Sequence, residues 1–268
     1  MARLLLRLTG CRGLLIGGLL LIASSAFAEA VRYVAPAAKG EGTGQDAQNA
    51  AAYLNEAFWQ EVQGLLAQGP VTVRFLDGVY SGPELNLNGV GHDQHRLTLR
   101  GDTSDGAVFS GDTNWYIRLR GSHHITFTDL HFRGPVRSFP IHMQELGSRD
   151  RPSHHIRIED CTFTDMHTVV YGALGVVNGS HHITVRGCTF RGVGLDGRAH
   201  MAYNTHGAHH LYYYDNIFED CTGEYVRFRN GCEHVEVARN IFRSTEPKYN
   251  SPFVSMPLFN DVNPGDEI

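Results

Sequence analysis

Five segments of the chain share one pattern: HHITFTDLHF (residues 123–132), HHIRIEDCTF (154–163), HHITVRGCTF (181–190), HHLYYYDNIF (209–218) and EHVEVARNIF (233–242). The second residues of their leading pairs, at positions 124, 155, 182, 210 and 234, are 31, 27, 28 and 24 residues apart. A self-similar period of this size is typical of stacked structural repeats. Apolar and polar residues alternate within each segment, which predicts a strand and not a helix.

Equivalent positions of the five segments should form columns in the stack. An aliphatic column would contain Ile125, Ile156, Ile183, Leu211 and Val235. An aromatic column would contain Phe132, Phe163, Phe190, Phe218 and Phe242. A third column, near a turn, would contain Leu130, Cys161, Cys188, Asn216 and Asn240. A leucine-rich repeat is disfavoured because its Leu/Asn consensus and its helix are missing from the pattern.

Repeats of this length with several short strands each predict an all-β fold, a single-stranded right-handed parallel β-helix. Strand patterns at 71–76, 97–100 and 115–119 extend the stack upstream, which gives about seven coils. Residues 47–66 have the pattern of an amphipathic capping helix, with Asp46 as its N-cap. Its apolar stripe would be Leu54, Phe58, Val62 and Leu65. We expect four parts: a signal peptide (1–28), an N-terminal cap with the helix (29–70), the parallel β-helix (71–242) and a C-terminal cap or tail (243–268).

The first 28 residues have the pattern of a secretory signal peptide. Arg3, Arg7 and Arg12 lead into the apolar run 14–22, and Ala26-Phe27-Ala28 matches an A-x-A cleavage site. The apolar run is too short to span a membrane. We therefore expect a secreted or periplasmic protein that has no membrane attachment after signal cleavage.

The composition limits the partners and the chemistry. Hydrophobic residues make up 42% of the 268 residues and charged residues 19%, as in ordinary globular proteins. Removal of residues 1–28, which hold three Arg and no acid, lowers the formal charge from −5 to −8. A negative charge disfavours nucleic acid and anionic membranes as partners. Lysine occurs only at Lys39 and Lys248, so a mechanism that needs a lysine between these positions has none.

The many histidines and the cysteines have a structural interpretation. Nine of the 16 histidines lie in the repeated pairs: His123, His124, His154, His155, His181, His182, His209, His210 and His234. Imidazole suits Zn, Cu and Ni, but repetition of one position also produces a ladder, and we interpret these residues as structural. Cys161 and Cys188 should be stacked neighbours, for which buried thiols are favoured over a disulfide.

The strands that precede the repeats should carry a ligand site on their outer face. In the last of these strands Val226 and Phe228 should point inward, because they are apolar and alternate with their neighbours. The outward positions would then be Tyr225, Arg227 and Arg229 in this strand, Met201, Tyr203 and Thr205 one coil earlier, and Ala173, Gly175 and Val177 before that. This alignment places Tyr203 beside Arg227.

Such a set of side chains suits chemistry on a uronic acid. Arg227 or Arg229 could hold a carboxylate with its guanidinium fork, and Tyr203 or His200 could serve as base and acid next to it. The residues expected to bind substrate around these four are His206, Glu224, Tyr225, Arg118, Arg120 and His142. The alternative is that the Arg and Tyr side chains are solvated or ion-paired, for instance with Glu224.

Several features resemble the pectin-lyase-like superfamily of parallel β-helix proteins. They are Tyr33-Val34-Ala35-Pro36, the cap helix, VRFLDGVYSG (73–82) and the repeated Asn/Phe turns, and the resemblance covers nearly all of the chain after residue 28. The stretch 216–242 is similar to the family of chondroitinase B and related alginate lyases. In that family an Asn-x-Phe turn is followed by Gly-Glu and by a strand with a catalytic Lys, whereas this chain has Gly231 at the lysine position.

The resemblance implies a carbohydrate-active protein but leaves its activity open, because one fold carries many functions. We expect an exported, monomeric enzyme that acts on an anionic polysaccharide by proton abstraction and β-elimination. The alternatives are a non-catalytic carbohydrate-binding or envelope protein, a glycoside hydrolase and a uronan C5-epimerase. We expect no cofactor and no metal. Calcium, which assists many β-helix lyases, is an alternative at Asp102, Asp105 and Asp112.

Overall fold

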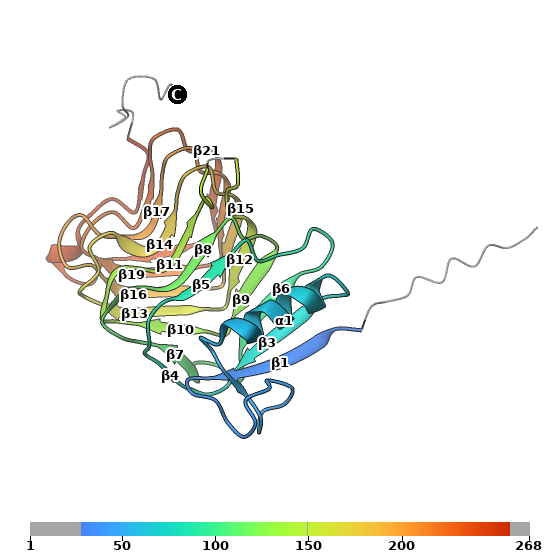
Figure 1. The fold of residues 1–268 in the computed structure, drawn as a ribbon. Helices are drawn as coiled ribbons and strands as arrows, with labels where there is room; N and C mark the ends of the chain where they lie inside the picture. Colours follow the sequence, from blue (N-terminus) through green and yellow to red (C-terminus); the bar gives the residue numbers. More distant parts are fainter. Residues whose placement is uncertain (1–27, 149, 258–268) are drawn as a thin grey trace, which may run out of the picture.

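The computed structural model describes residues 28–148 and 150–257, whose strands form three parallel sheets (Figure 1). The predicted signal peptide lies outside the described residues except for residue 28, so it stays a prediction. Within the described part of the chain, no helix has the length and apolarity needed to cross a bilayer.

The chain passes repeatedly from one sheet to the next, so that each circuit adds one strand to each sheet. Sheet A contains, in spatial order, β2 (Ala51–Ala52), β1 (Ala30–Ala35), β3 (Val71–Phe75), β6 (Leu97–Gly101), β9 (Ile125–Thr128), β12 (His154–Glu159), β15 (His181–Arg186), β18 (His209–Tyr214) and β21 (Glu233–Ala238). Sheet B contains β4 (Gly78–Tyr80), β7 (Ala107–Phe109), β10 (His131–Arg133), β13 (Thr162–Met166), β16 (Thr189–Val193), β19 (Ile217–Cys221) and β22 (Ile241–Arg243). Sheet C contains β5 (Leu85–Asn88), β8 (Thr113–Arg120), β11 (Val136–Gln144), β14 (Gly172–Val176), β17 (His200–Asn204), β20 (Val226–Phe228) and β23 (Val254–Ser255). The predicted parallel β-helix of about seven coils is confirmed.

The predicted columns are in register and fill the core. In sheet A, Ile156 pairs with Ile183 and Ile183 with Leu211. In sheet B the phenylalanine rings of successive coils stack with centroids 4.6–5.0 Å apart. Such stacked rings bury much apolar area and add a specific contact between coils.

The third predicted column is also present, and its polar members are satisfied. The thiols of Cys161 and Cys188 are buried and free, as expected. The side-chain oxygen of Asn216 accepts a hydrogen bond from the backbone nitrogen of Cys188 at 2.9 Å, and that of Asn240 accepts one from the backbone nitrogen of Asn216 at 2.9 Å. Each asparagine therefore ties its own coil to the coil before it.

The single α-helix of the described chain, α1 (Glu56–Leu66), lies beside the first strands of sheet A (Figure 1). It begins later than predicted: Asn55 is the N-cap, and its side chain accepts hydrogen bonds from the backbone nitrogens of Ala57 and Phe58. Asp46 instead closes a local turn. The helix cannot start at residue 47 because Ala51 and Ala52 pair with β1. Its buried face consists of Phe58, Trp59, Val62 and Leu66.

The parallel stacking extends beyond residues 71–242 at both ends. Strand β1, in the region expected to be an N-terminal cap, pairs with β3. Strand β23, in the expected C-terminal cap or tail, pairs with β20. The helix α1 therefore covers a stack that already includes β1.

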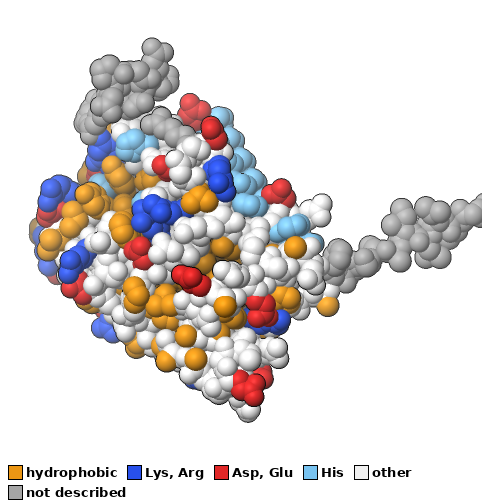
Figure 2. Space-filling view, viewed as in Figure 1, with side chains coloured by type: hydrophobic (Ala, Val, Ile, Leu, Met, Phe, Trp, Pro, Cys, Tyr) orange, Lys and Arg blue, Asp and Glu red, His pale blue; other side chains and the backbone are white. Residues whose placement is uncertain are grey.

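The histidine pairs form the predicted ladder at the start of the sheet A strands. The first residues of the pairs, His123, His154, His181 and His209, stack with ring centroids 4.7–5.0 Å apart. The second residues, His124, His155, His182, His210 and His234, stack at 4.5–4.6 Å. Figure 2 shows histidine side chains in a row along the side where Figure 1 labels β15 and β21. The second histidine of every pair has a φ between 50° and 55°, which histidine adopts more readily than β-branched residues do.

Candidate active site on sheet C

One outward column of sheet C brings predicted site residues from five coils into line. Arg118 pairs with His142, His142 with Gly175, Gly175 with Tyr203, and Tyr203 with Arg227. At the usual strand spacing the column is about 19 Å long. The predicted neighbours Tyr203 and Arg227 are therefore adjacent, and Arg118 and His142 lie on the same face.

An aromatic row runs along this face. The ring of His142 stacks between Trp115 and Phe139, with centroids 6.1 and 5.0 Å away. Phe139 continues the row to Tyr171 at 5.8 Å and to Tyr203 at 6.4 Å. Sequence reasoning missed Trp115, Phe139 and Tyr171. Phe139 was hidden by a register irregularity between Val136 and Phe139, which breaks the alternation that would have revealed it.

A cavity of about 310 Å³ lies at one end of this row. It is lined by Tyr171, Gly197, Arg198, His200, Tyr203, Arg227 and Arg229. The four residues predicted to be catalytic, His200, Tyr203, Arg227 and Arg229, are all in its wall. Gly197, Arg198 and Tyr171 come from the turns that lead into β17 and β14, and turn residues have no periodic pattern from which they could have been predicted.

His200 is held in a defined orientation. Its side chain is stacked on Tyr203 at 5.1 Å, and only 5% of the residue is exposed. Its Nδ1 lies 3.1 Å from the carbonyl oxygen of Glu224, so we assign the proton to Nδ1 and the lone pair to Nε2. Burial lowers the pKa of His200 to about 4. The imidazole is therefore neutral near pH 7, with the lone pair of Nε2 free of a proton.

Arg227 is already ion-paired within the site. Its Nη1 donates to Oε2 of Glu224, and the same carboxylate oxygen lies 3.6 Å from Nδ1 of His200. The side chain of Arg227 is 17% exposed and that of Glu224 is 21% exposed. Glu224 thus contacts two of the four predicted catalytic residues and compensates the charge of Arg227.

Arg229 approaches the hydroxyl of Tyr203. Its Nη1 is 3.5 Å from that oxygen, and its Nε donates to the side-chain oxygen of Asn230 at 3.2 Å. Arg198, also in the cavity wall, pairs with Asp196 at 2.8 Å and has a side chain that is 77% exposed. The cavity wall therefore contains a guanidinium close to the Tyr203 hydroxyl and a second, more exposed one at Arg198.

Tyr225 does not point outward, which corrects the sequence prediction. It is fully buried, and its hydroxyl donates to the carbonyl oxygen of Arg243 at 2.7 Å. The alternation fails because the backbone nitrogens of Met201 and Ala202 both bond to the carbonyl oxygen of Tyr225, which is a bulge-like irregularity. Met201 is consequently buried too.

The structure differs from the sequence prediction at three further residues. Thr205, expected beside Arg229, is only 1% exposed. His206 is exposed in the turn after β17, where its φ is 54°, and it is not part of the cavity wall. Ala173 is fully buried, whereas its neighbour Gly175 is in the outward column.

The upstream residues Arg118, Arg120 and His142 form a second polar area on the same face. The guanidinium of Arg118 lies 4.4 Å from the ring centroid of Trp115, a cation–π contact. Arg120 on β8 is the register partner of Gln144 on β11. Burial, followed by the charges of Arg118 and Arg120, lowers the pKa of His142 to about 4.

The aspartates considered for calcium have separate partners. Asp102 pairs with Arg74 at 3.2 Å, and Asp112 pairs with Arg137 at 2.7 Å. Asp105 accepts a hydrogen bond from the hydroxyl of Thr162 at 3.1 Å. This arrangement adds no argument for a calcium site.

Comparison with known proteins supports the fold. No protein-family model matches the chain, and no curated protein matches it. Among solved structures, the chain is similar to a mannuronic acid specific polysaccharide family 6 lyase from human gut microbiota, with 15% identity and a TM-score of 0.50 over 85% of this chain and 52% of that chain. A pectate lyase, Pel9A, is matched with 12% identity and a TM-score of 0.32, over 80% of this chain and 78% of that one. The chain thus spans about half the length of the family 6 lyase and shares its parallel β-helix fold.

Proposed function

We propose that the protein acts on an anionic, uronic-acid-containing polysaccharide by proton abstraction and β-elimination. The observation that carries the proposal is the sheet C cavity, which combines a neutral buried His200, the Tyr203 hydroxyl and the Arg229 guanidinium. The shared fold with a mannuronic acid specific lyase supports a substrate of this class.

Each group has a role in this reaction. The guanidinium of Arg229 would neutralise the carboxylate of the uronic acid, so that negative charge can build up next to C5. Nε2 of His200 would take the C5 proton, and its Nδ1–H remains bonded to the carbonyl oxygen of Glu224. The Tyr203 hydroxyl would give its proton to the oxygen that leaves C4. The C5–H and C4–O bonds break and a C4=C5 double bond forms.

Glu224 is the positioning residue of this arrangement. After proton transfer His200 carries a positive charge, and the Glu224 carboxylate 3.6 Å from Nδ1 would stabilise that charge. The ion pair with Arg227 holds the carboxylate in place. Arg227 is therefore a support for Glu224, whereas Arg229 is better placed to meet the substrate.

The test is a lyase assay with matched tyrosine variants. We expect the chain to raise the ultraviolet absorbance of polymannuronate, pectate or glycosaminoglycan solutions as unsaturated ends form. Tyr203→Phe keeps the stacked ring but removes the acid, so its rate should fall by roughly 10²-fold or more. Tyr212→Phe, on β18 of sheet A and away from the cavity, should keep the wild-type rate. Absence of absorbance change with every uronan, or equal rates of the two variants, would refute elimination at this site.

A second candidate function is carbohydrate binding without turnover. It is favoured by the Arg227–Glu224 pair, which leaves one guanidinium of the cavity already compensated. It is also favoured by Tyr171 in the cavity wall, which is 55% exposed and offers a ring for stacking on sugars. Calorimetric binding of oligouronates without new absorbance would identify it. Hydrolysis by paired carboxylates is disfavoured because no carboxylate is among the described residues that line the cavity.

Export belongs to the same proposal. A polysaccharide substrate is met outside the cytoplasm, and residues 1–28 have the pattern of a signal peptide. The mass of the protein recovered from the periplasm or medium should correspond to a chain that begins at Glu29. Recovery of the uncleaved chain from the cytoplasm alone would contradict export.

A further inference from the structure

The two stacks of the histidine ladder face each other through their Nδ1 atoms. The Nδ1 atoms of His123 and His124 are 3.0 Å apart, and the three following pairs have separations of 2.8, 2.7 and 2.7 Å. Two neutral imidazoles in this arrangement share one proton between two ring nitrogens. In each pair the two Nδ1 atoms therefore point toward each other. Ring stacking alone would not require this orientation.

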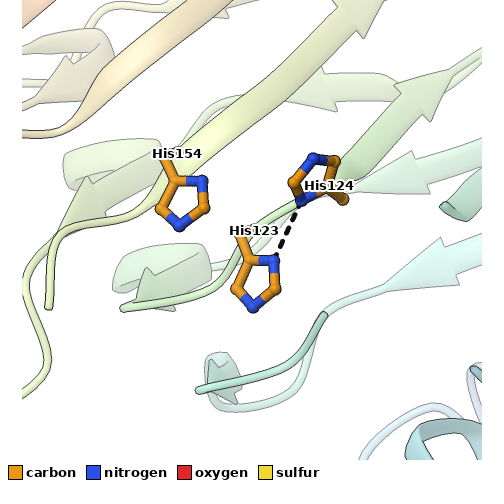
Figure 3. A group of neighbouring side chains, drawn as sticks. All are labelled: His123, His124 and His154. Atoms are coloured by element: carbon orange, nitrogen blue, oxygen red, sulfur yellow. Dashed lines mark hydrogen bonds between the residues drawn. The ribbon is translucent and has the colours of Figure 1, made fainter. Parts of the chain in front are cut away.

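The first rung of the ladder adds a third ring nitrogen, and a carboxylate lies beside one of its three histidines. His123, His124 and His154 each have a ring nitrogen within 4.8 Å of the others, and Figure 3 shows the ring of His124 beside the stacked rings of His123 and His154. Oδ1 of Asp93 lies 3.6 Å from Nδ1 of His123. An open cavity of about 420 Å³, lined in part by Asp93 and His123, adjoins this rung.

Two of these separations, both measured from Nδ1 of His123, are close to the ligand spacing of a tetrahedral metal site. Nitrogen and oxygen ligands about 2.0–2.1 Å from a zinc ion stand roughly 3.3 Å apart. The His123–His124 distance of 3.0 Å and the Asp93–His123 distance of 3.6 Å lie on either side of this value. The His154 ring is stacked on that of His123 with centroids 4.7 Å apart, so it has to turn for its nitrogen to reach the same ion. When the ion binds, the shared proton would move to Nε2 of its own ring.

We propose that His123, His124 and His154, with the Asp93 carboxylate beside His123, bind a divalent transition-metal ion of the Zn, Cu or Ni class. Three imidazole nitrogens suit these ions, whereas calcium and magnesium prefer oxygen ligands only. The cavity beside Asp93 gives the ion a path to the site. A similar group lies on the next coils and consists of His155, His181 and His182. It would bind a second metal ion more weakly. The site lies on sheet A and is independent of the function proposed for sheet C.

The test is metal titration of the protein without an added polyhistidine tag. Calorimetry should show zinc binding that calcium and magnesium do not compete with, and copper(II) should bind more tightly than zinc. Cobalt(II) should give the visible absorption of a low-symmetry nitrogen-ligated ion. His124→Asn keeps a residue that accepts positive φ but removes one ligand. Binding of the first zinc ion should therefore be lost or weakened about tenfold or more.

Two further variants make the result decisive. Asp93→Asn changes a side chain that is 84% exposed, so the fold should survive, and zinc affinity should still fall several-fold. His234→Asn changes the last rung, with a φ of 50° close to the 55° of His124, and should leave zinc binding unchanged. Zinc binding that is no tighter than magnesium binding overturns the proposal. So does equal binding by wild type, His124→Asn and Asp93→Asn.

Discussion

Gly175 occupies the middle of the outward column of sheet C, between His142 and Tyr203. A Cβ atom at this position would lie 2.7 Å from Cδ2 of His142 and 3.1 Å from the ring of Phe139. The two rings are buried and stacked on each other, so they have little room to move. The absence of a side chain at residue 175 is therefore what allows the aromatic row to form.

Gly175→Ala should disturb this row. Because the new methyl group forces buried rings apart, we expect a loss of about 1–3 kcal/mol in the free energy of unfolding. Binding of oligouronates should weaken at the same time, because Tyr203 is part of the row. Urea denaturation and calorimetry measure the two effects. Wild-type stability of Gly175→Ala would show that the rings can move aside.

At the residue scale, the sequence predicted which side chains line the cavity better than it predicted local departures from the strand alternation. His200, Tyr203, Arg227 and Arg229 follow from the register of the repeats, since stacked coils place equivalent positions side by side. Ion pairing with Glu224 was the alternative interpretation of the sequence, and the structure contains this pair at Arg227. The burial of Tyr225 depends on a local bulge. A period-two pattern contains no information about such a bulge.

At the element scale, α1 was predicted from its apolar stripe, but its first residue was not. The helix begins at Glu56 because Asn55 caps it and Ala51 and Ala52 are taken by a strand pairing with β1. That pairing involves only two residues and cannot be seen in the sequence. Helix existence depends on a pattern over many residues, whereas a helix start depends on one contact.

Two substitutions in α1 should change stability in opposite directions. Gly64→Ala should raise the free energy of unfolding by about 0.5–1 kcal/mol, because an exposed helical glycine gains a methyl group that meets no atom within 4 Å. Asn55→Ala should lower it by about 1 kcal/mol, because the hydrogen bonds to Ala57 and Phe58 are lost. Chemical denaturation of both variants measures the difference. A decrease for Gly64→Ala would show that α1 is constrained by more than its own backbone.

At the scale of the whole molecule, protonation of histidines should weaken the fold. Burial lowers the pKa of His142 and of His200 to about 4, and the same cause lowers those of His124, His154 and His181 to about 4 in the ladder. In the unfolded chain a histidine has a pKa of about 6.5. The unfolded state therefore binds more protons than the folded state as the pH falls below about 6.5. The stabilisation is complete above that pH and is lost progressively as the pH falls through about 4.

This pH dependence is measurable by urea unfolding between pH 7 and pH 4.5. For His142 and His200, the most buried of these residues, the loss should approach roughly 3 kcal/mol each at the acidic limit. His142→Phe keeps a ring between Trp115 and Phe139 but cannot be protonated there, so its stability should fall less steeply with pH. His167→Gln, at an exposed position, serves as the control. Parallel curves for wild type and His142→Phe would contradict the role assigned to burial.

The whole-molecule architecture was the most predictable level. Five aligned segments fix the repeat, the alternation fixes the strands, and the inward columns fix the register between coils. The loops were unpredictable for a related reason. They join strands whose positions are already set by the core, so their residues are under no periodic constraint.

The unequal coil lengths have a consequence for how this scaffold can be changed. The segment between β11 and β12 covers residues 145–153, whereas the corresponding segment between β14 and β15 covers only 177–180, and the strands on either side remain in register. Coils therefore tolerate insertions in their turns. The turn 194–199, which contributes Gly197 and Arg198 to the cavity, is such a place. A longer turn at this place would change the shape of the cavity and leave the pairing of the strands unchanged, so the cavity and the fold can be altered separately.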